Sequence, residues 1–177
     1  GVVKATAGYT VFKDGQDNYY WNGSFDEPWY KQKDNKIWNV SVAFDLAKDL
    51  YFRADYLKSN IDGINMNGHL NPSFDGDDGY IIGLNYKGAK ANEPGSYGVY
   101  ANYYDQARST VIAHTMNGFY GNNGFKGYMI GANYTFAKNV VGAIEWYDLE
   151  SKGLADGYYP VRKQDMETLW AQVAFTF

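Results

Sequence analysis

Three residues in one stretch of the chain could in principle support nucleophilic chemistry. Ser109 and Thr110 supply hydroxyl groups, and His114 follows closely as a possible base. However, the sequence holds no Gly-x-Ser-x-Gly motif of the kind that presents a serine nucleophile, and no third residue is evident to orient the histidine. We therefore expect no catalytic site here, and interpret the protein as not an enzyme.

A second stretch contains carboxylates at short spacing. The run Asp75-Gly76-Asp77-Asp78-Gly79 resembles part of a calcium-binding loop, but it lacks the bidentate Glu that closes such a loop. An acidic, solvated turn is the favoured interpretation. The two histidines, His69 and His114, lie too far apart to suggest paired metal ligands, and the chain has no cysteine. The sequence therefore predicts no metal site and no cofactor.

A third group of residues suggests a task that involves no bond making. Six charged residues interrupt segments in which apolar and polar residues alternate, and we expect them to line a pore: Lys4, Asp45, Arg53, Asp55, Lys87 and Glu145. Arg53 and Asp55 are two positions apart, so on a strand they share a face and can pair. Charges inside a strand need water or a partner, and a water-filled lumen offers both.

The composition indicates a strand-rich chain of one domain, residues 1–177. Aromatic residues make up 19% of the sequence, with 18 Tyr and 20 Gly, which favours strands and turns over helices. The apolar runs are about five residues long, far below the roughly 20 that a membrane-spanning helix needs. With 20 acidic and 16 basic residues the formal net charge is -4, so we expect no nucleic-acid partner.

Eight segments alternate at the period of a β-strand, and no helical periodicity competes with them. They cover residues 2–13, 37–47, 50–59, 79–88, 96–105, 126–137, 140–150 and 167–177. The connections between them are alternately long and short, which is typical of an outer-membrane barrel with external loops and tight periplasmic turns. The sequence predicts an all-β, antiparallel transmembrane barrel, although a soluble ligand-binding barrel stays open as a further class.

The positions of the aromatic residues along each strand indicate which strand face points inward and which points outward. On the apolar face of 79–88, Tyr80 and Tyr86 flank Ile82 and Leu84, as aromatic girdles flank a hydrocarbon band. A soluble barrel would turn this face inward, whereas a membrane barrel turns it toward lipid. The aromatic ends and the mid-strand charges of the opposite face favour the membrane orientation.

Several motifs resemble the C-terminal part of the OmpM-type porins, which carry an S-layer-homology domain in diderm Firmicutes such as the Negativicutes. They are Tyr86-Lys87-Gly88-Ala89, Ile112 to Gly118, Phe125-Lys126-Gly127, Gly131 to Asn139, Tyr147-Asp148-Leu149-Glu150 and Thr168 to Phe177. The resemblance covers roughly residues 37 to 177. It implies a sixteen-stranded barrel in the outer membrane, a homotrimer, and passive diffusion of small hydrophilic solutes.

The chain departs from that family in having about eight strands and no wall-binding domain or rod. It is either the C-terminal half of a sixteen-stranded porin barrel or a complete, closed eight-stranded barrel that acts as an adhesin or anchor through its external loops. Small residues on the predicted inner faces favour the wider lumen: Ala43, Gly83, Gly98, Gly131 and Ala143. In the closed alternative, the inward charges would form a structural ion-pair lattice.

One predicted external loop is unusually apolar. The segment from Gln106 to Phe125 carries Val111, Ile112, Met116 and Phe119. We expect this loop either to fold inward as a constriction or to pack against a neighbouring subunit, since either arrangement would cover its apolar surface.

Overall fold

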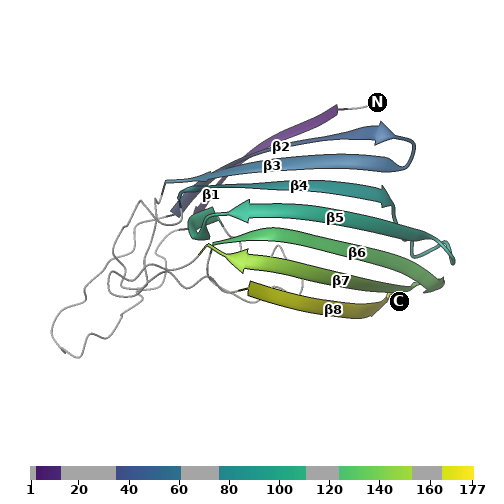
Figure 1. Ribbon diagram of the computed structural model, residues 1–177. Helices are drawn as coiled ribbons and strands as arrows, with labels where there is room; N and C mark the ends of the chain where they lie inside the picture. Colours follow the sequence, from purple (N-terminus) through teal and green to yellow (C-terminus); the bar gives the residue numbers. More distant parts are fainter. Residues whose placement is uncertain (1–2, 13–34, 61–75, 111–123, 153–164) are drawn as a thin grey trace.

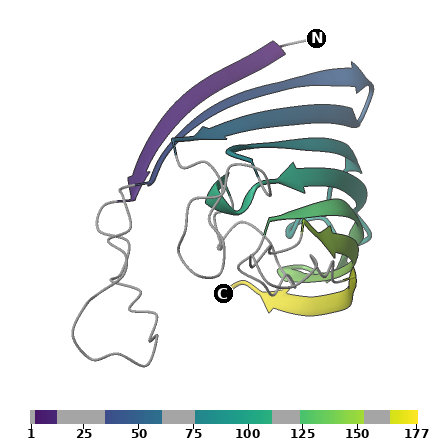
Figure 2. The same ribbon diagram turned by 60° about the vertical axis from the view of Figure 1, so that its left-hand side comes forward.

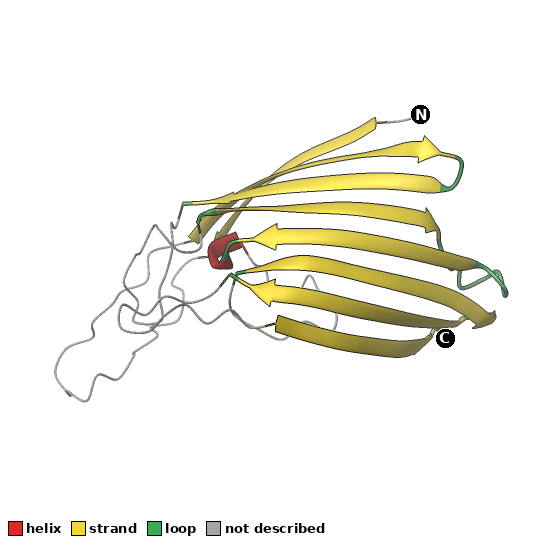
Figure 3. Cartoon of the chain, viewed as in Figure 1, coloured by secondary structure: helices red, strands yellow, loops and turns green. Residues whose placement is uncertain are grey.

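A computed structural model describes residues 3–12, 35–60, 76–110, 124–152 and 165–177. Eight strands account for most of these residues: β1 (Val3–Phe12), β2 (Asn35–Ala47), β3 (Leu50–Ser59), β4 (Asp78–Lys87), β5 (Tyr97–Gln106), β6 (Phe125–Ala137), β7 (Val140–Ser151) and β8 (Asp165–Phe175). The only other regular element in this part of the chain is a short 3₁₀ helix, η1 (Arg108–Thr110), drawn in red in Figure 3. The all-β prediction is confirmed, and the predicted strand ends differ from the observed ones by at most two residues.

The strands form one antiparallel sheet in the order of the sequence, β1 to β8 (Figure 1). The sheet is strongly curved, and β6 to β8 curl underneath it (Figure 2). β1 and β8 are its edges and are not paired with each other, so the sheet is open in the part of the chain that the structure describes. No helix among these residues is long and apolar enough to cross a membrane.

The short connections lie together at one end of the sheet, which we call the turn side. Lys48-Asp49 and Lys138-Asn139 are tight turns, and residues 88–96 form the third connection. Each tight turn follows a shift in strand register and contains a residue with left-handed backbone, Asp49 (φ 62°) or Asn139 (φ 64°). Asp and Asn tolerate this conformation better than other non-glycine residues, which explains why these two hairpins are alike. The remaining connections leave from the opposite end, the loop side.

The outer face of the sheet is apolar and exposed. Val42 is 37% exposed, Ile82 42%, Ile130 49% and Val173 54%, whereas a soluble barrel would bury such residues. The inner, concave face carries the polar and small residues at the alternate positions. The side-chain alternation predicted from the sequence therefore matches the two faces of the sheet.

The sequence suggested an inner face of small and polar residues, but part of this face is apolar and filled. Over β5 to β7 it holds a buried cluster of Tyr104, Phe125, Met129, Tyr147 and Leu149. Tyr104 and Phe125 lie with their ring centroids 5.9 Å apart. The strong curl of β6 to β8 brings these side chains together, and the open groove of the inner face is lined mainly by β2 to β5.

Candidate functional site: the two faces of the sheet

Aromatic side chains form a belt on the outer face near the loop side, with one residue from each of β1 to β7. This loop-side belt consists of Tyr9, Trp38, Tyr56, Tyr80, Tyr103, Tyr128 and Trp146. Neighbours in the belt touch: ring centroids are 4.4 Å apart for Tyr9 and Trp38, and 5.6 Å apart for Tyr128 and Trp146.

A second aromatic belt lies on the outer face near the turn side. This turn-side belt consists of Phe44, Phe52, Tyr86, Tyr97, Tyr134, Phe136 and Phe175. Phe44 and Phe52 pair across β2 and β3 with ring centroids 5.1 Å apart. Aliphatic residues fill the space between the belts: Val42, Ala54, Ile82, Leu84, Val99, Ala101, Ile130, Ala132, Ile144, Leu169, Ala171 and Val173.

The spacing of the belts is regular. Tyr80 and Tyr86 in β4 are six positions apart, and the same separation recurs in β5 and β6. At about 3.3 Å per residue, six positions span roughly 20 Å along a strand. Charged residues of the outer face appear beyond the loop-side belt, where Tyr128 donates a hydrogen bond to Asp148 (2.8 Å) and Lys126 pairs with Glu150 (3.7 Å). This succession from charge to aromatic to aliphatic is typical of a surface that faces lipid.

On the inner face, Arg53 and Asp55 form an ion pair within β3. Arg53 Nε lies 2.7 Å from Asp55 Oδ2, and Arg53 Nη2 donates a hydrogen bond to Asp55 Oδ1 (3.0 Å). The hydroxyl of Ser41 in the paired strand β2 also donates to Asp55 Oδ1. The side chain of Asp55 is only 6% exposed and that of Arg53 is 58% exposed, so the guanidinium faces the concave side while its counter-ion lies against the wall.

A second inner carboxylate, Glu145 in β7, is also buried and held by hydroxyl groups. Tyr100 donates to its Oε1 at 2.7 Å and Tyr147 donates to its Oε2 at 2.5 Å. Tyr100 reaches Glu145 across β6 because Gly131 stands between them: the cross-strand register runs Tyr100, Gly131, Glu145. A Cβ at residue 131 would collide with the Tyr100 ring. Glycine at this position is therefore required for the contact.

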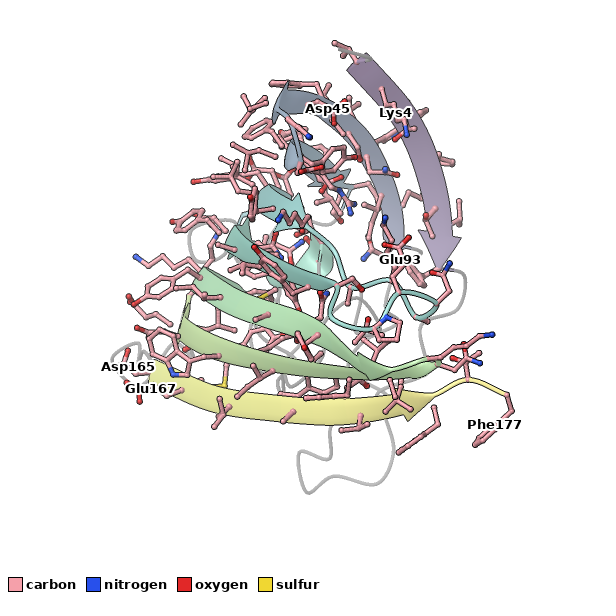
Figure 4. The ribbon with its side chains drawn as sticks, turned by 90° about the vertical axis from the view of Figure 1, so that its right-hand side faces the viewer. Lys4, Asp45, Glu93, Asp165, Glu167 and Phe177 are labelled. Carbon is pink, nitrogen blue, oxygen red and sulfur yellow. The ribbon has the colours of Figure 1, made fainter. Side chains whose placement is uncertain are left out.

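Lys4 and Asp45 also lie on the inner face, and both are exposed (Figure 4). Lys4 of β1 shares a cross-strand row with Arg53, and the small, buried Ala43 stands between them. Asp45 is nearer the turn side, where it borders a hollow whose other charged residues are Asp49, Lys87, Lys90 and Glu93.

Lys87 departs from the predicted arrangement. Its backbone is left-handed (φ 57°), and its ammonium group lies over the rings of Tyr86 and Tyr97, 5.3 and 4.7 Å from their centroids. Lys87 Nζ also donates to the Tyr97 hydroxyl at 3.2 Å. Both tyrosines belong to the turn-side belt, so Lys87 lies at the rim of the sheet and not at mid-wall.

A groove of about 460 Å³ runs along the inner face beside Arg53. Its walls include Asn39, Asn102, Gln106 and Thr110. Three glycines on the inner face allow asparagines of neighbouring strands to lie flat against the wall, at the cross-strand pairs Gly8 and Asn39, Gly83 and Asn102, and Gly98 and Asn133. A side chain at these glycines would displace the amides into the concave space.

The predicted apolar loop, from Gln106 to Phe125, is described only at its two ends. Its beginning lies on the inner side of the sheet. Asn35 Nδ2 donates to the carbonyl of Ser109 at 2.7 Å, and Thr110 is fully buried beside Gly79 of β4. Residues 107–110 thus pass inward over β4 toward β2. Residues 111–123 lie outside the described residues, as does His114.

The sequence predicts no metal site and no catalytic site, and the structure describes only some of the residues on which these predictions rest. Asp75, His69 and His114 lie outside the described residues. Asp77 forms an ion pair with Lys58 (2.5 Å), and Asp78 begins β4. Within the described ranges, no group of three or more acidic or histidine side chains is placed to hold a metal ion.

The sequence interpretation missed Tyr100 and Tyr147. Both occupy inner positions in the strand alternation, so a large aromatic residue on an otherwise polar face was the available signal. Comparison with models of protein families finds none that matches the chain, and a search of characterised proteins finds no match either.

Proposed function

We propose that this chain forms part of the wall of an outer-membrane porin through which small hydrophilic solutes diffuse passively. The observation that carries the proposal is the outer face: two aromatic belts enclose an exposed aliphatic band, while the charged mid-strand residues lie on the concave face. In water such a surface would aggregate, whereas in a bilayer it is the stable arrangement. The lipid of the outer membrane would be its direct partner.

The sheet edges support a barrel wider than eight strands. β1 and β8 each have one paired neighbour in the described part of the chain, and an unpaired edge is costly in lipid because its backbone groups lack hydrogen-bond partners. Further strands would satisfy both edges. A sixteen-stranded barrel of the OmpM type, assembled as a homotrimer, is the form suggested by the resemblance described above.

A second candidate is supported by the inner cluster around Tyr104 and Phe125. Side chains that fill the inner face of β5 to β7 suit a closed eight-stranded barrel, which would act as an adhesin or anchor through its external loops. In that form β1 would have to pair with β8.

Conductance distinguishes the two candidates. The full-length protein that carries this chain would be folded into detergent, checked for heat-modifiable migration, and reconstituted into planar bilayers. We expect stepwise channels of nanosiemens size in 1 M KCl, on the order found for wide aqueous barrels. A folded protein that inserts without conducting would contradict the porin proposal and favour the closed barrel. A protein that folds to a stable state without detergent or lipid would contradict both.

A further inference from the structure

The inner wall treats its basic and acidic side chains differently. At mid-wall, Lys4 and Arg53 are exposed, whereas Asp55 and Glu145 are buried, at 7% and 6% exposure. The other exposed charge of the inner face within the described strands, Asp45, lies nearer the turn side, in a hollow that the acids Asp49 and Glu93 border as well as Lys87 and Lys90. A solute that touches the middle of the wall therefore meets cations, although the whole chain has a net charge of -4.

The two carboxylates are also chemically occupied. Asp55 accepts hydrogen bonds from Ser41 and Arg53, and Glu145 accepts one at each oxygen from Tyr100 and Tyr147. Neither acid offers its charge readily to a passing cation. The guanidinium of Arg53, in contrast, uses its Nε and one Nη for Asp55, and its remaining N–H groups have no partner among the described residues.

The surroundings of Arg53 make this guanidinium reachable. Its cross-strand neighbours are Ala43 and Gly83, so no large side chain stands beside it in its row. It borders the groove of about 460 Å³, whose other polar groups include the amides of Asn39 and Asn102. Ser41, Asp55 and Thr110 also border it, and the Asn102 amide donates to the Tyr104 hydroxyl (3.1 Å). Among the described lining residues Arg53 is the only cation, and the planar fork of an Arg side chain matches the two oxygens of a carboxylate.

We propose that this groove is a transient binding site for small organic carboxylates, with Arg53 as the anchoring residue. Lys4 lies outside the groove lining, in the same cross-strand row beyond Ala43, and adds positive charge to this part of the wall. The proposal rests on the porin function proposed above and adds a solute class to it. Asp55 and Ser41 are positioning residues: both border the groove, but Asp55 is bound to Arg53 and Ser41 donates to Asp55, so they hold the guanidinium in place. The pore would therefore prefer anions, and a carboxylate would reside longer in it than chloride.

The test uses single channels of the full-length protein, with succinate as the probe. Removing Arg53 alone would leave Asp55 buried without its cation, which destabilises folds. The primary variant is therefore the double substitution Arg53→Gln with Asp55→Asn, which removes the guanidinium while the net charge of the wall stays the same. The matched control is Lys126→Gln with Glu150→Gln, an ion pair of the outer face.

Two readouts are compared. In a KCl gradient the wild-type reversal potential is expected on the anion-selective side, and the Arg53/Asp55 double variant is expected to lower the chloride-to-potassium permeability ratio by about twofold or more. Micromolar to millimolar succinate should reduce the wild-type current, and the double variant should lose this block. Arg53→Lys retains the charge but not the fork, so it should keep the ion preference and weaken the succinate block.

The outcomes separate this inference from the porin proposal. Channels that conduct but show the same reversal potential and succinate block in the wild type and the double variant would overturn the inference and leave the porin proposal intact. If no channels form, the porin proposal fails. Succinate binding to the detergent-folded protein then decides, measured by the broadening of the succinate NMR signal. Binding to the wild type that the double variant loses supports the site. No binding to the wild type, or equal binding to both proteins, overturns it.

Discussion

The hydroxyl of Tyr100 lies 2.7 Å from Oε1 of Glu145, although β6 separates the strands that carry these two residues. The contact exists because the intervening residue, Gly131, has no side chain, so the tyrosine ring lies flat over β6. A glycine opposite an aromatic residue is a known device for shaping curved sheets. Here it also delivers a hydrogen bond to a buried carboxylate.

The first prediction concerns this glycine. Gly131→Ala places a Cβ where the Tyr100 ring now lies, so the ring must move and its bond to Glu145 is lost. We expect the free energy of unfolding to fall by about 1–3 kcal/mol, the usual effect of losing a hydrogen bond to a buried charged group. Reversible urea unfolding in lipid vesicles measures this difference.

Gly88→Ala is the control for that substitution, since nothing lies within 4 Å of a Cβ added at residue 88. It should change the stability by much less. Replacing Gly by Ala lowers the entropy of the unfolded chain, which by itself favours folding. Equal losses for the two variants would therefore mean that displacing the Tyr100 ring costs nothing and that its contact with Glu145 does not contribute.

A second prediction compares two tyrosine hydroxyls that both donate to carboxylates. Tyr147→Phe leaves the buried Glu145 Oε2 without its donor and should cost about 1.5–3 kcal/mol. Tyr128→Phe removes the bond to Asp148, which lies on the exposed outer face, and should cost less than about 1 kcal/mol because water can replace the donor. The same vesicle unfolding measurement applies, and a larger cost for Tyr128→Phe would contradict the burial of Glu145.

Local pattern predicted the strands well because alternation is a short-range property. In β4, the order Tyr80, Ile82, Leu84, Tyr86 on one face was readable from the sequence and is the order found on the outer face of the sheet. The tight turn at Asp49 was equally visible, because the adjoining segments left only two residues between them.

The contacts of the inner face depend on long-range register, which a single sequence does not contain. The bond between Tyr100 and Glu145 needs three strands to be aligned at once, with Gly131 in the middle. The inner cluster around Phe125 needs the curl of β6 to β8. The contacts of Lys87 were also not readable from alternation, because this last residue of β4 has a left-handed backbone and its ammonium group lies over the rings of Tyr86 and Tyr97.

A third prediction tests which face meets lipid. Leu84→Lys puts a charge into the aliphatic band between the belts, where it should destabilise the protein in vesicles by about 2–4 kcal/mol. Asn85→Lys, at the next position of β4, points to the inner face and should have little effect. Both variants carry the same new charge on the same strand. If Asn85→Lys were the more damaging substitution, the assignment of the two faces would be reversed.

The last prediction uses two native tryptophans as depth probes. Trp146 belongs to the loop-side belt on the outer face, whereas Trp170 lies on the inner face of β8, paired with Glu145 across the strands. In vesicles, a variant that keeps only Trp146 should be quenched more strongly by lipids brominated near the headgroup than by lipids brominated near the chain ends, because aromatic belts sit at the membrane interface. A variant that keeps only Trp170 should respond weakly to either lipid and more strongly to acrylamide in the water. Strong lipid quenching of Trp170 together with aqueous quenching of Trp146 would show that hydrocarbon covers the concave face, and the proposed pore could not exist.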